Sequence, residues 1–213
     1  MLSYIAILIA AYLLGSIPTG FLVAKARGVD IRKVGSGNIG ATNAFRILGK
    51  NAGAFVLVAD GLKGFVACAW ACDLWLWLLD SAGVPLGPTF GYRVLSGIAV
   101  VLGHNYTCWL WFKGGKGIAT SAGVYLALAP LAAGLAVVTW VVLFLLTRFV
   151  SLSSIAAAVA LPTAVWFTKD SVALGLVTTA LGILAIAKHR TNIQRLLKGT
   201  ENRIQFKGRQ TTS

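Results

Sequence analysis

The chain has 213 residues, of which 57% are hydrophobic and 12% charged, and its mean hydropathy is +0.80. A soluble domain carries about 25% charged residues, about twice the fraction in this chain. Long apolar stretches recur six or seven times along the sequence, and so short a chain cannot bury them all in water, so the composition excludes a soluble domain. The formal net charge of +13 would suggest nucleic acid in a soluble protein. Here the basic residues cluster in short loops between apolar runs, as the positive-inside rule describes, so we predict a polytopic membrane protein.

The first apolar stretch, residues 2–23, carries no charge and is long enough to cross a bilayer core of about 30 Å. Gly15, Pro18 and Gly20 interrupt its second half, which fits either a simple kink or broken backbone that lines a cavity. It has no basic n-region and no small-residue cleavage site, so we interpret it as a retained span. The following loop, 25–50, holds six basic residues against the single acid Asp30, which predicts a cytoplasmic position.

The second predicted span, 52–79, contains Asp60 and Lys63, which lie three residues apart and so share a helix face. Ionisable groups within a span usually face the protein interior or a wet cavity, and we interpret this pair as functional or as support for a site. The third span, 94–112, passes through His104, which we interpret as structural, and leads into the loop 113–117.

Residues 118–147 carry no charge, and one helix of that length is too long for a bilayer. We therefore divide the stretch near Pro130 into spans 118–131 and 132–147, and add spans 152–168 and 172–187. With the N-terminus outside and the C-terminus cytoplasmic, these seven spans put every basic residue except Lys63, Arg93 and Lys169 in a cytoplasmic segment. The expected fold is an all-α, seven-helix, single membrane domain over 1–213, with Lys169 and Asp170 as a neutral outer pair and a basic tail.

Three polar loops on the predicted cytoplasmic side, 25–50, 113–117 and 188–203, hold residues suited to an oxyanion. Glycine-rich backbone supplies N–H donors in the first two, short polar side chains add further donors, and an arginine and a lysine supply positive charge. In the third, a histidine and an asparagine lie one helical turn apart at the base of the last span. The candidate site residues are Ser36, Gly37, Asn38, Thr42, Asn43, Arg46, Gly114, Gly115, Lys116, His189 and Asn192.

Other chemistries find little support in the sequence. The spacing Gly35-x-Gly37-x-x-Gly40 matches a dinucleotide fingerprint, but a membrane span and not a strand precedes it. Lys116 does not belong to a Walker loop, because Gly117 stands where Ser or Thr is needed. The chain shows no carboxylate pair, catalytic triad or metal-ligand cluster, and its cysteines lie in apolar segments. We therefore expect neither metal nor cofactor, and charge stabilisation by cations and backbone donors.

The order of these motifs resembles the bacterial glycerol-3-phosphate acyltransferases that take their acyl group from acyl-phosphate, the PlsY family. The resemblance covers nearly the whole chain and rests on residues 15–20, 35–46, 60–64, 103–104, 112–120 and 189–201. It implies transfer of a fatty acyl group from acyl-phosphate to the 1-hydroxyl of glycerol 3-phosphate, which gives lysophosphatidic acid and phosphate in the first acylation of phospholipid synthesis. It also implies a multi-pass protein of the bacterial cytoplasmic (inner) membrane that contacts membrane lipid, needs no metal, and requires neither nucleic acid nor a protein partner.

Roles follow as hypotheses, with Ser36, Lys116 and His189 as catalytic residues and the other candidates as substrate ligands. Arg46 and Lys116 would bind phosphate, the 36–43 segment would cradle the acyl-phosphate or the tetrahedral oxyanion, and His189 and Asn192 would position glycerol 3-phosphate. Either His189 or a substrate phosphate would accept the proton. A small transporter of an organic phosphate remains an alternative, although no inverted repeat is evident, and so does an enzyme that uses acyl-CoA.

Overall fold

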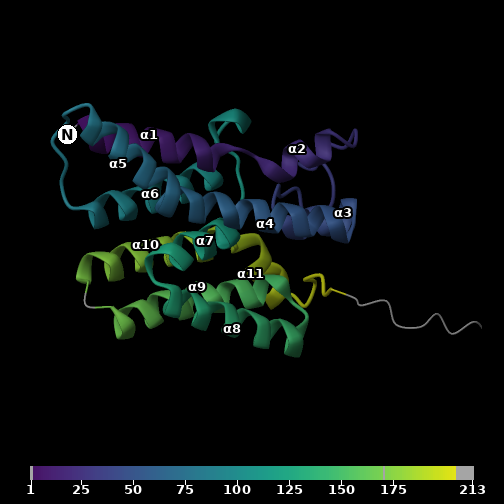
Figure 1. Ribbon diagram of the computed structural model, residues 1–213. Helices are drawn as coiled ribbons and strands as arrows, with labels where there is room; N and C mark the ends of the chain where they lie inside the picture. Colours follow the sequence, from purple (N-terminus) through teal and green to yellow (C-terminus); the bar gives the residue numbers. More distant parts are fainter. Residues whose placement is uncertain (1, 170, 205–213) are drawn as a thin grey trace, which may run out of the picture. The chain divides into compact units, whose positions relative to one another are not determined.

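The computed structural model describes residues 2–169 and 171–204, and every secondary-structure element assigned in them is helical. Asp170 of the predicted neutral pair, and Lys207 and Arg209 of the basic tail, lie outside the described residues. The chain divides into two compact units, Met1–Pro130 and Leu131–Ser213 (Figure 1). The all-helical fold class predicted from composition is confirmed.

The first unit contains seven α-helices and two short helical turns of other types among the described residues. They are α1 (Leu2–Ser16), α2 (Thr19–Lys25), α3 (Ala41–Leu48), α4 (Lys50–Val66), α5 (Cys72–Ser81), α6 (Thr89–Asn105) and α7 (Ile118–Leu128), with a π-helical turn η1 (Ala67–Ala71) between α4 and α5 and a 3-10 turn η2 (Cys108–Leu110) after α6. The second unit is built from α8 (Pro130–Thr147), α9 (Val150–Thr168), α10 (Val172–Lys188) and α11 (Arg190–Leu197).

The first predicted span is broken at Ile17 and Pro18. Proline has no N–H and disfavours helical geometry at the residue before it, so α1 ends at Ser16. Side chains from the same unit satisfy the carbonyl groups at the break, because Thr107 Oγ1 donates to the Ser16 oxygen at 2.5 Å and Lys63 Nζ donates to the Ile17 oxygen at 3.0 Å. Backbone can therefore leave the helix here without an unsatisfied carbonyl in an apolar environment.

Two tight helix pairs form the frame of the first unit. Helix α1 packs along α6, and α4 packs along α7 (Figure 1). A Cβ atom on Gly103 of α6 would collide with the Tyr12 backbone of α1, and one on Gly123 of α7 would collide with the Gly61 backbone of α4. Small residues at such crossings let helices approach closely, which is how helices associate in lipid.

The second unit is held by a helix hairpin and by polar links at its tryptophans. Helix α9 packs against α10, and Trp166 Nε1 of α9 donates to Thr179 Oγ1 of α10 at 3.1 Å. Trp140 Nε1 of α8 donates to Ser154 Oγ of α9 at 3.1 Å. Both of these indole N–H groups therefore find partners within apolar helices.

Four helices of the described residues are long and apolar enough to cross a membrane, namely Leu2–Lys25, Lys50–Ser81, Pro130–Thr147 and Val150–Thr168. Helices α10 and α11 would make a fifth if taken together, although they are bent by 57°. Helices α6 and α7 are shorter, at 17 and 11 residues. The count of seven spans and the orientation of the termini therefore stay predictions.

Two helix boundaries bear on those predictions. Helix α7 ends at Leu128 and α8 begins at Pro130, so a helix break lies where we divide the charge-free stretch, and the two spans themselves stay predictions. The helix that overlaps the predicted third span, 94–112, is α6, which begins at Thr89 and ends at Asn105. Trp111 and Phe112 then take left-handed φ angles of 53° and 59°, which reverse the chain and begin the 113–117 loop.

Candidate active site

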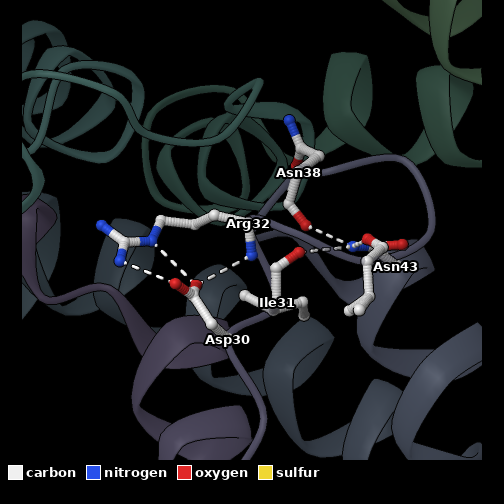
Figure 2. A network of polar contacts seen from close by, with 6 residues as sticks. Asp30, Ile31, Arg32, Asn38 and Asn43 are labelled. Atoms are coloured by element: carbon white, nitrogen blue, oxygen red, sulfur yellow. Dashed lines mark hydrogen bonds and ion pairs between the residues drawn. The ribbon is translucent and has the colours of Figure 1, made fainter.

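Asn43, in the first turn of α3, organises the first polar loop from within (Figure 2). Its side chain is 1% exposed, and its Nδ2 lies 3.2 Å from the Ile31 oxygen, 3.1 Å from the Val34 oxygen and 2.9 Å from the Asn38 oxygen. Its Oδ1 accepts the N–H of Ser36 at 3.0 Å. Both ends of the amide are thus committed to the loop backbone, so Asn43 shapes the loop.

The remaining predicted residues of the first loop lie nearer its surface. Ser36 and Gly37 are exposed, and Asn38 is half-buried with its Oδ1 accepting the Gly40 N–H at 2.8 Å. Thr42 and Arg46 are half-buried on α3 and, being four residues apart, share one helix face. The loop therefore carries an exposed hydroxyl at Ser36 and a guanidinium at Arg46 on the same segment, while the N–H groups of Ser36, Gly37 and Gly40 donate within the loop.

An ion pair closes the start of the same loop (Figure 2). The Arg32 guanidinium donates to both carboxylate oxygens of Asp30 at 2.9 Å, and the Arg32 N–H donates to Asp30 Oδ1 at 3.2 Å. The hydrogen bond from the Arg32 side chain lowers the pKa of Asp30 from 3.8 to about 2. The carboxylate therefore stays charged well into the acid range.

We expect Asp30→Asn to reduce the acid sensitivity of the fold. A lowered pKa gives stability that is present above the unfolded value of 3.8 and is lost as pH falls toward the folded value of about 2. Thermal unfolding in detergent between about pH 6 and pH 2 should show a wild-type advantage over the variant that shrinks below about pH 4. Asp80→Asn, at an exposed position on α5, is the control. An Asp30 advantage that persists unchanged at pH 2 would contradict the linkage.

The second loop, which we call the Lys116 loop (residues 113–117), folds back on the end of α6. The Gly114 N–H donates to the Asn105 oxygen at 3.2 Å, and the Gly115 N–H donates to the His104 oxygen at 2.9 Å. These two N–H groups, predicted to bind substrate, are occupied by protein carbonyls in this structure, so they fix the loop. Lys116 is half-buried and directly follows these two fixed positions.

The first loop and the approach to the Lys116 loop share one apolar core. Ile31 and Ile39 of the first loop pack in the same buried cluster as Leu110 of η2. Beside it, an apolar cavity of about 370 Å³ opens at the break between α1 and α2. It is lined by Ile17, Pro18, Phe21, Leu22, Trp109 and Leu110. The first unit therefore places an apolar cavity next to segments that carry polar loops.

The predicted pair of Asp60 and Lys63 is confirmed, with 2.9 Å between Asp60 Oδ1 and Lys63 Nζ. Nothing in the sequence connects His104 to this pair, yet the Nδ1 of His104 lies 3.6 Å from the same carboxylate oxygen. Thr19 Oγ1 donates to that oxygen at 3.1 Å. Sequence spacing identified the pair on α4, but only tertiary packing brings in residues from α2 and α6.

Glu201, which is not among the candidate site residues predicted from the sequence, binds several side chains around the third loop, in the second unit. Its carboxylate accepts hydrogen bonds from Ser151 Oγ at 2.9 Å, Asn192 Nδ2 at 2.8 Å and Arg195 Nε at 2.6 Å. Burial raises the pKa of Glu201, but these hydrogen bonds outweigh burial and hold the pKa below its usual value. Glu201 is charged at neutral pH and orients the amide of Asn192.

His189 lies at the bend between α10 and α11 and is 3% exposed. Its Nδ1 lies 2.8 Å from the Ala185 oxygen. A carbonyl only accepts, so Nδ1 carries the proton and Nε2 is the acceptor nitrogen of the neutral ring. His189 and Asn192 belong to the second unit, and the other predicted site residues belong to the first.

Comparison with known proteins agrees with this assembly of polar loops on apolar helices. A family model described as glycerol-3-phosphate acyltransferase matches residues 5–199. The chain is 50% identical to a glycerol-3-phosphate acyltransferase of Geobacter metallireducens, over 96% of this chain and 100% of that one. It is 45% identical to one of Geotalea daltonii, over 95% of this chain and 98% of that one.

Solved structures give the same result. The glycerol 3-phosphate form of PlsY, an integral membrane glycerol 3-phosphate acyltransferase, superposes with a TM-score of 0.83 at 41% identity and covers 95% of this chain and 96% of that one. Its lysophosphatidic acid form gives a TM-score of 0.80 at 40% identity.

The helices and the solved relatives define a multi-pass integral membrane protein. The chain belongs to the glycerol-3-phosphate acyltransferase family. The resemblance inferred from motif order is confirmed, and the protein is an acyltransferase of phospholipid synthesis. The transporter alternative is not favoured.

Proposed function

We propose that this enzyme transfers a fatty acyl group from acyl-phosphate to the 1-hydroxyl of glycerol 3-phosphate. The observation that carries the proposal is the juxtaposition, within the first unit, of two polar loops bearing Arg46 and Lys116 with an apolar cavity. Both substrates carry phosphate, which cations and backbone donors bind. The acyl chain is apolar, and the cavity lined by Phe21, Leu22 and Trp109 suits part of it. Family membership supports glycerol 3-phosphate as the acceptor.

The reaction needs little from the protein beyond charge stabilisation. The 1-hydroxyl oxygen attacks the acyl carbonyl carbon, the bond from that carbon to the phosphate oxygen breaks, and inorganic phosphate leaves. Arg46 and Lys116 stabilise the negative charge on the departing phosphate, and donors around Ser36 stabilise the tetrahedral oxyanion. Gly37, Asn38 and the loop shape set by Asn43 contribute to this cradle.

His189 and Asn192 position glycerol 3-phosphate in the proposal. The acceptor Nε2 of a neutral His189 can take the hydroxyl proton, and a substrate phosphate oxygen is the alternative acceptor. Glu201 fixes Asn192 at 2.8 Å, which leaves that amide oriented before substrate arrives. We expect the reaction to proceed without a metal.

The proposal includes the membrane arrangement. Seven spans, with the N-terminus outside and the three site loops on the cytoplasmic side of a bacterial inner membrane, would set the polar loops at the edge of the bilayer. Soluble glycerol 3-phosphate and a membrane-borne acyl donor would then meet there. The clustering of basic residues in the loops supports this orientation.

The identity of the acyl donor is the critical test of the proposal, and it can be measured with purified protein in detergent or lipid. We expect acyl-phosphate and glycerol 3-phosphate to give lysophosphatidic acid and phosphate in equal amounts, and acyl-CoA to give neither. Product from acyl-CoA instead would reject the donor assignment. No product from either donor with folded protein would reject the reaction, and tracer flux into sealed vesicles would then test transport.

A further inference from the structure

We propose that Asp60, together with Lys63, is a positioning residue for the Lys116 loop and acts on it through His104. The inference rests on the proposed function and deepens it, because it assigns a role in turnover to a buried ion pair that the reaction itself does not consume. All of its parts lie in the first unit.

The three side chains form a buried polar cluster across two helices. Asp60 and Lys63 of α4 and His104 of α6 are 3%, 7% and 6% exposed. Asp60 Oδ1 lies 2.9 Å from Lys63 Nζ and 3.6 Å from His104 Nδ1, and accepts from Thr19 Oγ1 at 3.1 Å. Removing charges from water is costly, and it is offset only where several well-placed partners converge. Ionisable groups kept at such a cost within a membrane helix usually serve function.

His104 joins this cluster to the Lys116 loop in two ways. Its carbonyl oxygen accepts the Gly115 N–H at 2.9 Å. Its imidazole covers the face of Gly115, since a Cβ atom there would collide with Nε2. Gly115 precedes Lys116 directly, so any rotation of the imidazole shifts the backbone that carries the cation. The Asp60 carboxylate lies 3.6 Å from Nδ1, so its negative charge attracts the Nδ1 side of the ring and favours this orientation.

Lys63 connects the same polar cluster to the broken first span. Its ammonium pairs with Asp60, so the carboxylate is balanced without a charge on His104, and it also donates to the Ile17 oxygen at 3.0 Å. Ile17 lines the apolar cavity. The cluster therefore links the broken first span, where we place the acyl chain, to the loop that holds Lys116, where we place the phosphate.

The neutral double variant Asp60→Asn/Lys63→Gln tests the proposal. It keeps side-chain size and leaves no buried charge without a partner, so we expect a thermal midpoint near that of the wild type. We expect kcat at saturating substrates to fall about 10- to 100-fold, since small misplacements of a catalytic group have effects of that size. Hydrogen exchange at residues 113–117 should become faster, because the imidazole packed on Gly115 loses the carboxylate beside it and no longer restrains the loop.

The control is Asp73→Asn/Arg93→Gln, which removes a more exposed ion pair of 2.8 Å between α5 and α6 and should leave turnover and loop exchange unchanged. Wild-type kcat with wild-type exchange at 113–117 in the Asp60/Lys63 double variant would overturn the proposal and make the pair purely structural. Failure of the proposed function would look different, since the wild type itself would make no lysophosphatidic acid. The exchange comparison tests the positioning role in either case.

Discussion

Lys116→Ala is expected to lower kcat by about 100- to 1,000-fold, the range seen when one preorganised charge-stabilising group is removed. The reason is geometric as much as electrostatic, because the Lys116 loop is fixed to α6 by the N–H groups of Gly114 and Gly115. An alanine keeps that loop but removes the cation. Phosphate release and lysophosphatidic acid formation, followed together with acyl-phosphate as donor, give the measurement.

Lys113→Ala is the matched control for Lys116. Lys113 belongs to the same loop but is exposed, and we expect it to keep kcat within about threefold because a solvated charge contributes little. Equal losses in the two variants would indicate a general effect of loop charge and would contradict a specific role for Lys116. A normal thermal midpoint in both variants shows that folding is intact.

Asn43→Asp is expected to disrupt the first loop and activity together. The change keeps the shape of the side chain but replaces a donor amide by a carboxylate facing three carbonyl oxygens at 2.9–3.2 Å. The Val34 oxygen keeps the Gly37 N–H as a donor, and the other two oxygens each lose a hydrogen bond at a cost of about 1–3 kcal/mol. We therefore expect a loss of about 2–6 kcal/mol in stability. Thermal unfolding in detergent and steady-state turnover measure the two effects.

Asn51→Asp tests whether the effect belongs to position 43. Asn51 is exposed in the first turn of α4, where an acid is tolerated or favourable. It should leave stability and turnover near wild-type values. An Asn43→Asp protein with normal stability and turnover would show that the loop keeps its shape without the amide donor.

The helices were predictable where the sequence carries a local signal. Long charge-free stretches marked apolar helices, and Pro18 and Pro130 marked the breaks, because proline lacks an N–H and restricts its predecessor. The end of α6 at Asn105 had no such mark. The helix stops at Tyr106, whose φ of −135° and ψ of 59° lie outside the helical region, and no proline or glycine marks that position in the sequence.

The residue types of the candidate site can be read from the sequence, but the packing of each side chain cannot. Glycine, asparagine and cations in three loops indicated anion binding, but the sequence does not say which asparagine turns inward. Asn43 is buried and Asn38 only partly so, and that difference arises from the fold of the loop. His104 was underestimated for the same reason, since its partner Asp60 lies far along the chain. Glu201 has nearby partners in Asn192 and Arg195, but its contact with Ser151 comes from tertiary packing.

The hydrogen bonds of Asn43 determine when the conformational entropy of the first loop is lost. One side chain ties Ile31, Val34, Ser36 and Asn38 to the start of α3, so this surface is already shaped before any substrate arrives. The entropy of ordering it is lost once, during folding, and not again in each catalytic cycle. In the proposed site, substrates would therefore meet a receptor that is rigid on this side, and variation in acyl chains would be accommodated by the apolar walls of the cavity.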